Sequence, residues 1–184
     1  MPLSGTEVRV GVTGTVYVAP GGTTPPANIS AAWTGFTDLG YTSEEGVTAA
    51  RSMTTEQVKA WQSIAPVRYL ITEVGEVFSF TLLQFNRATL PLYMGGGTVI
   101  AQGGGSYKLS ISSAPTIDER TLGIEWVDGS ITSRLIIPRG MVTETGELAV
   151  GRTDSVKLQM SFAAMTPAAG TELSYFLTND PAFA

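Results

Sequence analysis

The chain has 184 residues, 43% of them hydrophobic, and carries a formal net charge of -5 with only 15% charged residues. This length and composition suit one folded domain with a proper core, and the acidic balance argues against an electrostatic grip on nucleic acid or on an anionic membrane. The chain contains no cysteine and no histidine, which excludes disulfides, thiol nucleophiles, imidazole acid–base chemistry and zinc sites built from thiolate or imidazole ligands.

The start of the chain shows no targeting signal. Residues 1–6 form neither the basic nor the apolar segment of a signal peptide, and no apolar stretch approaches the length of a membrane span. We therefore expect a protein that is made in a cytoplasm and is used there or carried out as part of a larger assembly.

The first predicted element is a long strand over residues 6–19, in which valine recurs on alternate positions. Because side chains in a strand point alternately to opposite faces, this pattern gives one apolar and one polar face. Proline and glycine are frequent over the following residues, 20–35, and they predict a flexible loop. Residues 36–41 read as a short apolar link, and residues 43–46 as a turn.

The next region predicts a hairpin system. Strands are expected over residues 47–53, 57–61 and 67–72, with tight turns at residues 54–56 and 73–76. A further strand over residues 73–85 has apolar side chains on both faces, which is typical of a strand buried on two sides.

The only predicted helix covers residues 86–94. Asn86 is a favourable N-cap residue, and the glycines at 95–97 end the helix. Pro91 lies inside it, so the helix should be short or kinked.

The second half of the chain predicts more antiparallel strands. Alternation marks residues 107–111 and 122–126, and Asp128-Gly129 predicts a hairpin into a return strand at 131–137. Residues 141–150 fit either an edge strand or a loop. Strands over residues 155–165 and 173–177 complete the chain. The expected fold is therefore mainly β, an antiparallel β-sandwich or half-barrel with one short flanking helix and long loops.

No catalytic, cofactor or metal site is predicted. The carboxylate groupings Glu44-Glu45, Glu73 with Glu76, and Asp118-Glu119 each fall at a predicted turn, which favours solvated charge over a glycosidase pair. The denser acidic pattern of a calcium loop is absent. The tryptophans and tyrosines are scattered over apolar strand faces, which is typical of a core rather than of a sugar-binding platform.

Four stretches carry a resemblance to a known family. They are APGGTTPP at 19–26, FTDLGYTSEEGV at 36–47, KAWQSIAPVRYLITE at 59–73 and FSFTLLQFNRATLPLYMGGG at 78–97. In this order they resemble the major tail proteins, or tail tube proteins, of long-tailed bacteriophages, particularly those of actinobacterial hosts. None of the stretches is catalytic, and their order is the stronger sign.

The resemblance implies a structural virion protein and no enzyme. Residues 1–184 would form a single tail-tube domain with a flexible loop at about 20–35 and short terminal arms. As a separate hypothesis, we expect this loop and the arms to order only when rings stack. Subunits would assemble in the host cytoplasm into hexameric rings, and the rings would stack into the conduit for genome delivery. The implied partners are further copies of the chain, a tape-measure protein, and tail terminator and initiator proteins. DNA would pass without specific binding, helped by like-charge repulsion, and no membrane partner or cofactor is implied.

We expect the hairpin system at residues 47–85 to supply the strands that line the lumen. The candidate lumen or ring-contact residues are Arg51, Thr55, Gln57, Lys59 and Gln62. The pattern does not decide which face points inward, because an error of one residue in phase exchanges the two faces.

Three other functions remain open at this point. The first is a carbohydrate-binding β-sandwich module, which exposed coplanar aromatic side chains would favour. The second is a hydrolase that uses paired carboxylates, which the dispersed acidic residues disfavour. The third is another β-type structural component, such as a secretion-system tube or a capsid decoration protein, because a fold does not settle a function.

Overall fold

The computed structural model describes residues 7–170 and 172–183. The structure is mainly β and antiparallel, as the sequence predicts, with one short α-helix. In chain order the elements are β1 Thr13–Pro20, β2 Thr37–Asp38, β3 Thr42–Val58, β4 Arg68–Leu82, α1 Thr89–Tyr93, β5 Val99–Gly103, β6 Ser106–Leu109, β7 Arg120–Asp128, β8 Ile131–Thr145, β9 Leu158–Ala164, β10 Tyr175–Thr178 and the 3-10 turn Pro181–Phe183.

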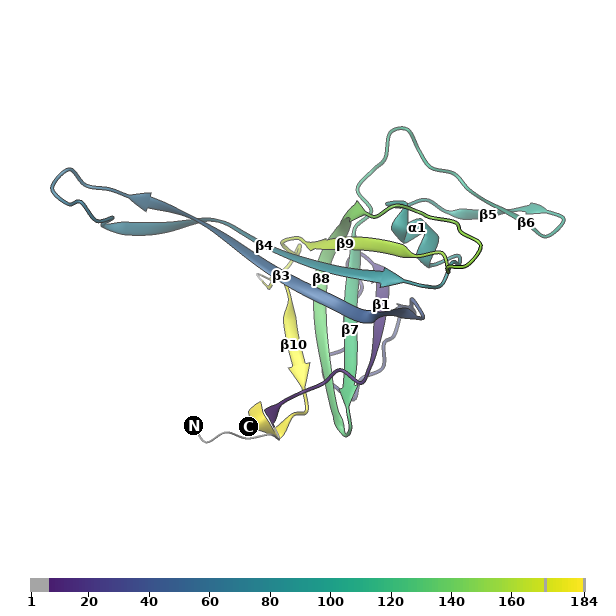
Figure 1. Ribbon diagram of the computed structural model, residues 1–184, viewed down its shortest axis with the longest axis horizontal. Coiled ribbons are helices and arrows are strands. Elements are labelled where there is room, and N and C mark those ends of the chain that lie inside the picture. The colour runs from purple at the N-terminus through teal and green to yellow at the C-terminus, as the bar shows by residue number, and fades with distance from the viewer. Residues whose placement is uncertain (1–6, 171, 184) are drawn as a thin grey trace.

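One long strand joins two layers. The large sheet has the order β2-β1-β7-β8-β9-β4-β3, and β10 also pairs with β8. The first part of β8, up to Gly140, pairs with β7, whereas Gly140 to Thr145 pairs with β9. Strand β8 therefore leaves one layer and enters the other. The first layer contains β1, β7 and β10, and the second contains β9, β4 and β3. The strands of the second layer cross those of the first (Figure 1). Strands that switch sheets in this way form the corners of a sandwich.

The core lies between these layers. Val16 and Ile124 enter it from one layer and Phe80 and Phe162 from the other, and all four are buried. Each such side chain contributes roughly 1.5–3 kcal/mol on burial. Tyr93 of α1 is also buried in this cluster, and its hydroxyl donates a hydrogen bond to the carbonyl of Gly146. The apolar side chains of β1, β9 and the inner part of β4 are therefore buried against other parts of the same chain.

Helix α1 begins at Thr89 instead of at Asn86, which corrects the expected start. The Asn86 side chain still organises the entry, because its Oδ1 accepts hydrogen bonds from the backbone N–H groups of Ala88 (2.8 Å) and Thr89 (3.1 Å). Pro91 falls within the first turn, where its missing N–H has no intrahelical partner to lose. The glycine stop is confirmed: Gly96 has φ of 123° and donates to the carbonyl of Pro91 at 2.8 Å.

The first strand is shorter than predicted. It begins at Thr13, opposite Val127 of β7, and Val8, Val10 and Val12 before it are exposed. The reason is the partner strand: β7 ends at Asp128, so residues further toward the N-terminus have no strand to pair with.

Three predicted turns do not reverse the chain. Residues 43–46 and 54–56 lie within β3, and residues 73–76 lie within β4. The pairing instead shifts register between Thr42 and Val47 and between Thr54 and Thr55. Such β-bulges absorb extra residues without reversing the strand, and Gly46 supplies the positive φ of 68° in the first. Consequently Glu44, Glu45, Glu73 and Glu76 are strand residues and not turn residues.

Several other expectations are settled by the structure. The Asp128-Gly129 hairpin and strand β9 are confirmed, and the ambiguous residues 141–150 belong to β8 up to Thr145. β4 is buried on the Phe78–Phe80 face but only half-buried on the other, and its first half is exposed. The short hairpin of β5 and β6 was only half predicted, because the strand formed by β5 is not marked by alternation.

The loop at residues 20–35 contacts the first layer through large side chains. Trp33 stacks on Tyr17 with ring centroids 4.6 Å apart, and its Nε1 donates to Glu125 at 3.1 Å. The buried Arg134 donates to the carbonyls of Asn28 (2.8 Å) and Ala31 (2.7 Å) and to Glu125 (2.6 Å). The guanidinium thus links two points of the loop to the sheet.

Candidate assembly interface

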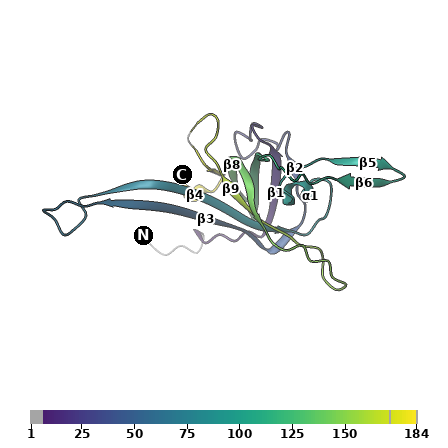
Figure 2. The same cartoon turned by 90° about the horizontal axis from the view of Figure 1, so that it is seen from above.

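A long two-stranded hairpin projects from the body. We call residues 51–76 the arm; it comprises the outer parts of β3 and β4 and the connecting tip at residues 59–67. The arm and the β5–β6 hairpin extend in opposite directions from the two layers (Figures 1 and 2). Only the inner part of β4, from Val77 to Leu82, pairs with β9, so beyond that point no further strand of the described chain covers the arm.

The register of the arm defines two faces. Phe78 and Phe80 point into the core, and the alternate positions further out continue the same side: Glu76 opposite Arg51, then Val74 opposite Met53. Beyond the bulge this face continues with Ile71 opposite Thr55 and Tyr69 opposite Gln57. We call it the core-side face.

The opposite face is formed by the residues between these positions. Thr54 lies opposite Glu73, Glu56 opposite Leu70 and Val58 opposite Arg68. The core-side face therefore carries an apolar row, and the opposite face carries most of the charge of the strands.

The apolar row is uncovered. Met53, Tyr69 and Ile71 are 58%, 59% and 62% exposed, in continuation of side chains that are almost completely buried. Isolated exposed apolar residues are ordinary on protein surfaces, but a row in strand register marks an interaction surface.

An ion pair marks the point where the buried core ends and the exposed row begins. The Nε of Arg51 lies 3.7 Å from Glu76, and Ser174 donates to the other oxygen of the same carboxylate at 2.5 Å. Glu76 is largely buried, whereas Arg51 is 70% exposed. The sequence did not predict this pair because its partners lie on opposite strands of the arm, and the register was not known.

All five candidate residues lie on the arm. Arg51, Thr55 and Gln57 share the core-side face, and Lys59 and Gln62 lie in the tip. Their expected role in the lumen or the ring contact stays a prediction. The neighbouring apolar residues Met53, Tyr69 and Ile71 were not predicted as site residues, although their spacing on opposite strands would have shown them once the register was known.

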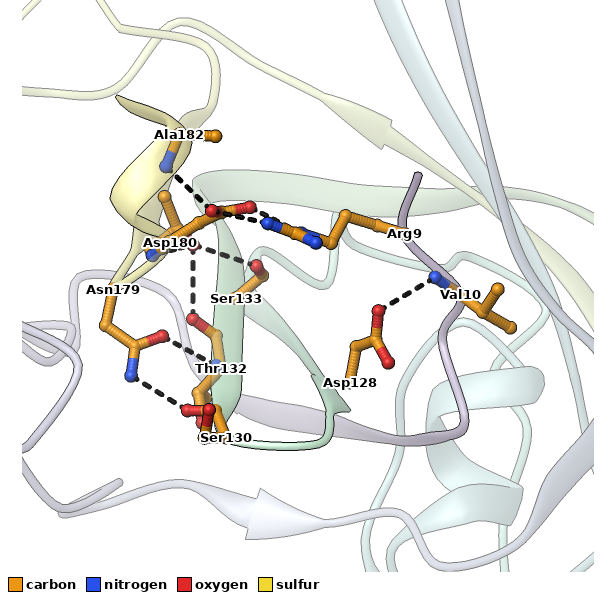
Figure 3. Close-up of polar contacts among 10 residues, drawn as sticks. Arg9, Val10, Asp128, Ser130, Thr132, Ser133, Asn179, Asp180 and Ala182 are labelled. Atoms are coloured by element: carbon orange, nitrogen blue, oxygen red, sulfur yellow. Dashed lines mark hydrogen bonds and ion pairs between the residues drawn. The ribbon is translucent and has the colours of Figure 1, made fainter. Parts of the chain in front are cut away.

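The two ends of the described chain are held together beside the β7–β8 turn (Figure 3). Arg9 donates two hydrogen bonds to Asp180, at 2.6 and 2.7 Å, and the backbone N–H of Val10 donates to Asp128 at 3.2 Å. The hydrogen bonds from Arg9, followed by one from the N–H of Ala182, hold the pKa of Asp180 below its ordinary value. We call this arrangement the terminal clasp.

The remaining charged and aromatic groupings are structural contacts. Asp118 pairs with Arg120 at 3.0 Å, and Glu119 pairs with Arg139 at 2.5 Å; the latter pair lowers the pKa of Glu119. Trp33 stacks on Tyr17 and Trp126 packs against Phe176 with the rings tilted, while Trp61 is exposed at the tip, so the tryptophans form no common platform. Within residues 7–170 and 172–183, no cluster of three or more carboxylates that could hold a metal ion is found, and no helix there is long and apolar enough to cross a membrane.

Fold and surface together define an antiparallel β protein that leaves one sheet face uncovered along a projecting hairpin. The model of the family described as phage tail tube protein matches residues 1–184. The chain therefore belongs to the phage tail tube protein family, as the resemblance predicted; the narrower similarity to actinobacterial phages stays a prediction.

The solved structures include a distant likeness. A chain in the cryo-EM structure of the anti-feeding prophage (AFP) baseplate, 6-fold symmetrised, is similar with a TM-score of 0.45 and 9% identity. The match covers 92% of this chain and 95% of that chain. No curated protein matches the sequence.

Proposed function

We propose that this chain is the repeating subunit of a phage tail tube, in which hexameric rings stack into the conduit for genome delivery. Membership of the family supports a structural role in the virion tail. The observation that carries the proposal is the uncovered apolar row on the core-side face, formed by Met53, Tyr69 and Ile71. An exposed sheet surface of this kind is covered when a second layer of strands packs on it.

The main partner in this assembly is a second copy of the chain. A head-to-tail contact that closes forms a ring, and its axial repetition forms a tube. Family resemblance adds a tape-measure protein and initiator and terminator proteins, with assembly in the host cytoplasm and residues 1–184 acting as one tail-tube domain. The proposed role is structural and not enzymatic.

The two faces of the arm then have different roles. The core-side face, with Arg51, Thr55 and Gln57, packs against the neighbouring copy. The part of the opposite face that carries Glu56 and Glu73 lines the lumen. Its carboxylates repel the phosphates of DNA, which favours passage without specific binding.

Two adjacent threonines provide a matched test of this arrangement. Thr54 and Thr55 lie on opposite faces of the arm, and the chain contains no cysteine that would react in the background. In assembled tubes, Thr55→Cys should be protected from a small maleimide, whereas Thr54→Cys should react with the small reagent but not with a bulky polymer-linked one. The reverse pattern would exchange the faces, and full reaction of both with the bulky reagent would place the arm outside the tube wall.

The assembly itself is tested by negative-stain electron microscopy and sizing over a range of concentrations. Hollow tubes or six-fold rings are the expected result. A chain that stays monomeric at every concentration, and that does not extend isolated tail-initiator complexes, would count against the proposed function.

A further inference from the structure

A groove of about 550 Å³ opens between the two layers at the base of the arm. Its floor contains core-facing side chains of the first layer, including the buried Val16 and Ile124 and the half-buried Trp126. Its rim carries the exposed Glu44 and Glu45, and among the described residues no lysine or arginine lines it. The groove therefore combines an apolar floor with a negatively charged rim.

The tip of the arm has the complementary properties. Trp61 and Ile64 are essentially fully exposed, at 99% and 106% of their reference areas. Lys59 and Arg68 flank them, and no carboxylate occurs between residues 57 and 72. An exposed tryptophan beside a second apolar side chain, with cations around it, has the composition of an interface hot spot.

The tip cannot reach the groove of its own chain. Strands β3 and β4 pair from Ala49 with Phe78 out to Val58 with Arg68, with one register shift between Thr54 and Thr55. At about 3.3 Å per residue, this ladder carries the tip roughly 30 Å away from the base, and Figure 1 shows the tip at the far end of the molecule. The same separation lets the tip reach an adjacent copy, and a contact between two different surfaces repeats from one copy to the next.

We propose that the tip of one copy docks into the groove of the next copy, with Trp61 and Ile64 on the apolar floor and Lys59 and Arg68 beside Glu44 and Glu45. The inference rests on the proposed function, because it assigns the contact that joins successive subunits. A docked tryptophan buries about 150–250 Å², and the groove volume lies within the roughly 300–1,000 Å³ of pockets that enclose small ligands. The opposite charges of tip and rim favour this pairing over a contact between two tips or two grooves.

Disulfide trapping tests the contact directly, because the native chain has no cysteine. One preparation carries Gln62→Cys in the tip, and a second carries Glu45→Cys on the rim. Mixing the two under mild oxidation should give a covalent heterodimer. The matched control pairs Gln62→Cys with Ser106→Cys on the exposed β5–β6 hairpin and should give none. Absence of the heterodimer, or equal yields from both mixtures, would overturn the proposal.

Charge reversal tests its electrostatic part. Reversing the rim with Glu44→Lys and Glu45→Lys, with Gln62→Cys and Ala49→Cys as the trapping pair, should lower the cross-link yield at least about tenfold. Reversing the tip instead, with Lys59→Glu and Arg68→Glu, should have the same effect, and combining the two reversed surfaces should restore the yield. Failure of the combination to restore it would overturn the assigned pairing. The substituted side chains lie outside the buried core, and circular dichroism checks that each variant is folded.

Electron microscopy of the same samples separates the two proposals. Tubes that form without the cross-link would overturn the docking contact and leave the proposed function standing. A specific cross-link without tubes or rings would support the docking contact and count against the tube.

Discussion

Strand β9 and the arm both alternate apolar and polar side chains, yet only β9 meets a second layer of its own chain. Leu158, Met160 and Phe162 of β9 are at most 1% exposed, whereas Met53 and Ile71 of the arm are more than half exposed. Alternation gives a strand an apolar face, but that face stabilises the fold only when a second layer buries it. The body therefore uses its pattern for folding, whereas the arm keeps the same kind of pattern available for association.

The largest expected effect is in the body. Phe162→Ala removes a fully buried ring and should lower the free energy of unfolding by about 3–5 kcal/mol. The matched change in the arm, Tyr69→Ala, should alter it by less than about 0.5 kcal/mol, because that ring is already exposed. Denaturant unfolding of the monomer measures both. Similar losses for the two variants would show that the arm is part of the folded core.

A smaller effect is expected where the loop at residues 20–35 meets the sheet. A Cβ at Gly123 would lie 2.3 Å from the Trp33 ring, so Gly123→Ala should displace that ring and cost about 1–3 kcal/mol. The same displacement should expose the loop to limited proteolysis. Gly151→Ala is the control, since a Cβ there meets nothing within 4 Å. Equally rapid cleavage of the wild-type and Gly123→Ala monomers would instead support the prediction that this loop orders only when rings stack.

Acid should weaken the body through its ion pairs. Arg9 lowers the pKa of Asp180 and Arg139 lowers the pKa of Glu119, so the unfolded chain binds these protons at a higher pH than the folded chain does. The stabilisation is therefore complete above the ordinary carboxyl pKa of about 4 and is lost as the pH falls through the lower folded values. Asp180→Asn should reduce the loss of thermal stability between about pH 4 and pH 2. An unchanged acid profile would show that the terminal clasp does not contribute.

The sequence predicted most of the body because its elements are determined locally. The alternation around Phe162, the Asp128-Gly129 hairpin and the glycine stop after α1 all appear where they were expected. The arm was divided wrongly at Thr54–Glu56 and Glu73–Glu76, because turn-favouring residues there occupy a bulge or a plain stretch of strand. Bulges and turns contain the same residue types, and they differ only in how the residues pair across the hairpin. The sequence of one strand does not reveal that pairing. For the same reason the five candidate residues could be placed on the hairpin but not on a face.

The smallest expected effect on stability separates the two faces of the arm. Leu70 and Ile71 are adjacent, are both exposed and point to opposite sides, opposite Glu56 and Thr55 respectively. Leu70→Thr and Ile71→Thr should each change the free energy of unfolding of the monomer by less than about 0.5 kcal/mol. If the core-side face is the contact face, Ile71→Thr loses about 1–2 kcal/mol of apolar burial per contact. That loss raises the concentration needed for assembly about tenfold. Leu70→Thr should leave this concentration nearly unchanged. Light scattering during assembly measures that concentration. A larger shift for Leu70→Thr would make the opposite face the contact and would turn the core-side face, with Arg51, Thr55 and Gln57, toward the lumen.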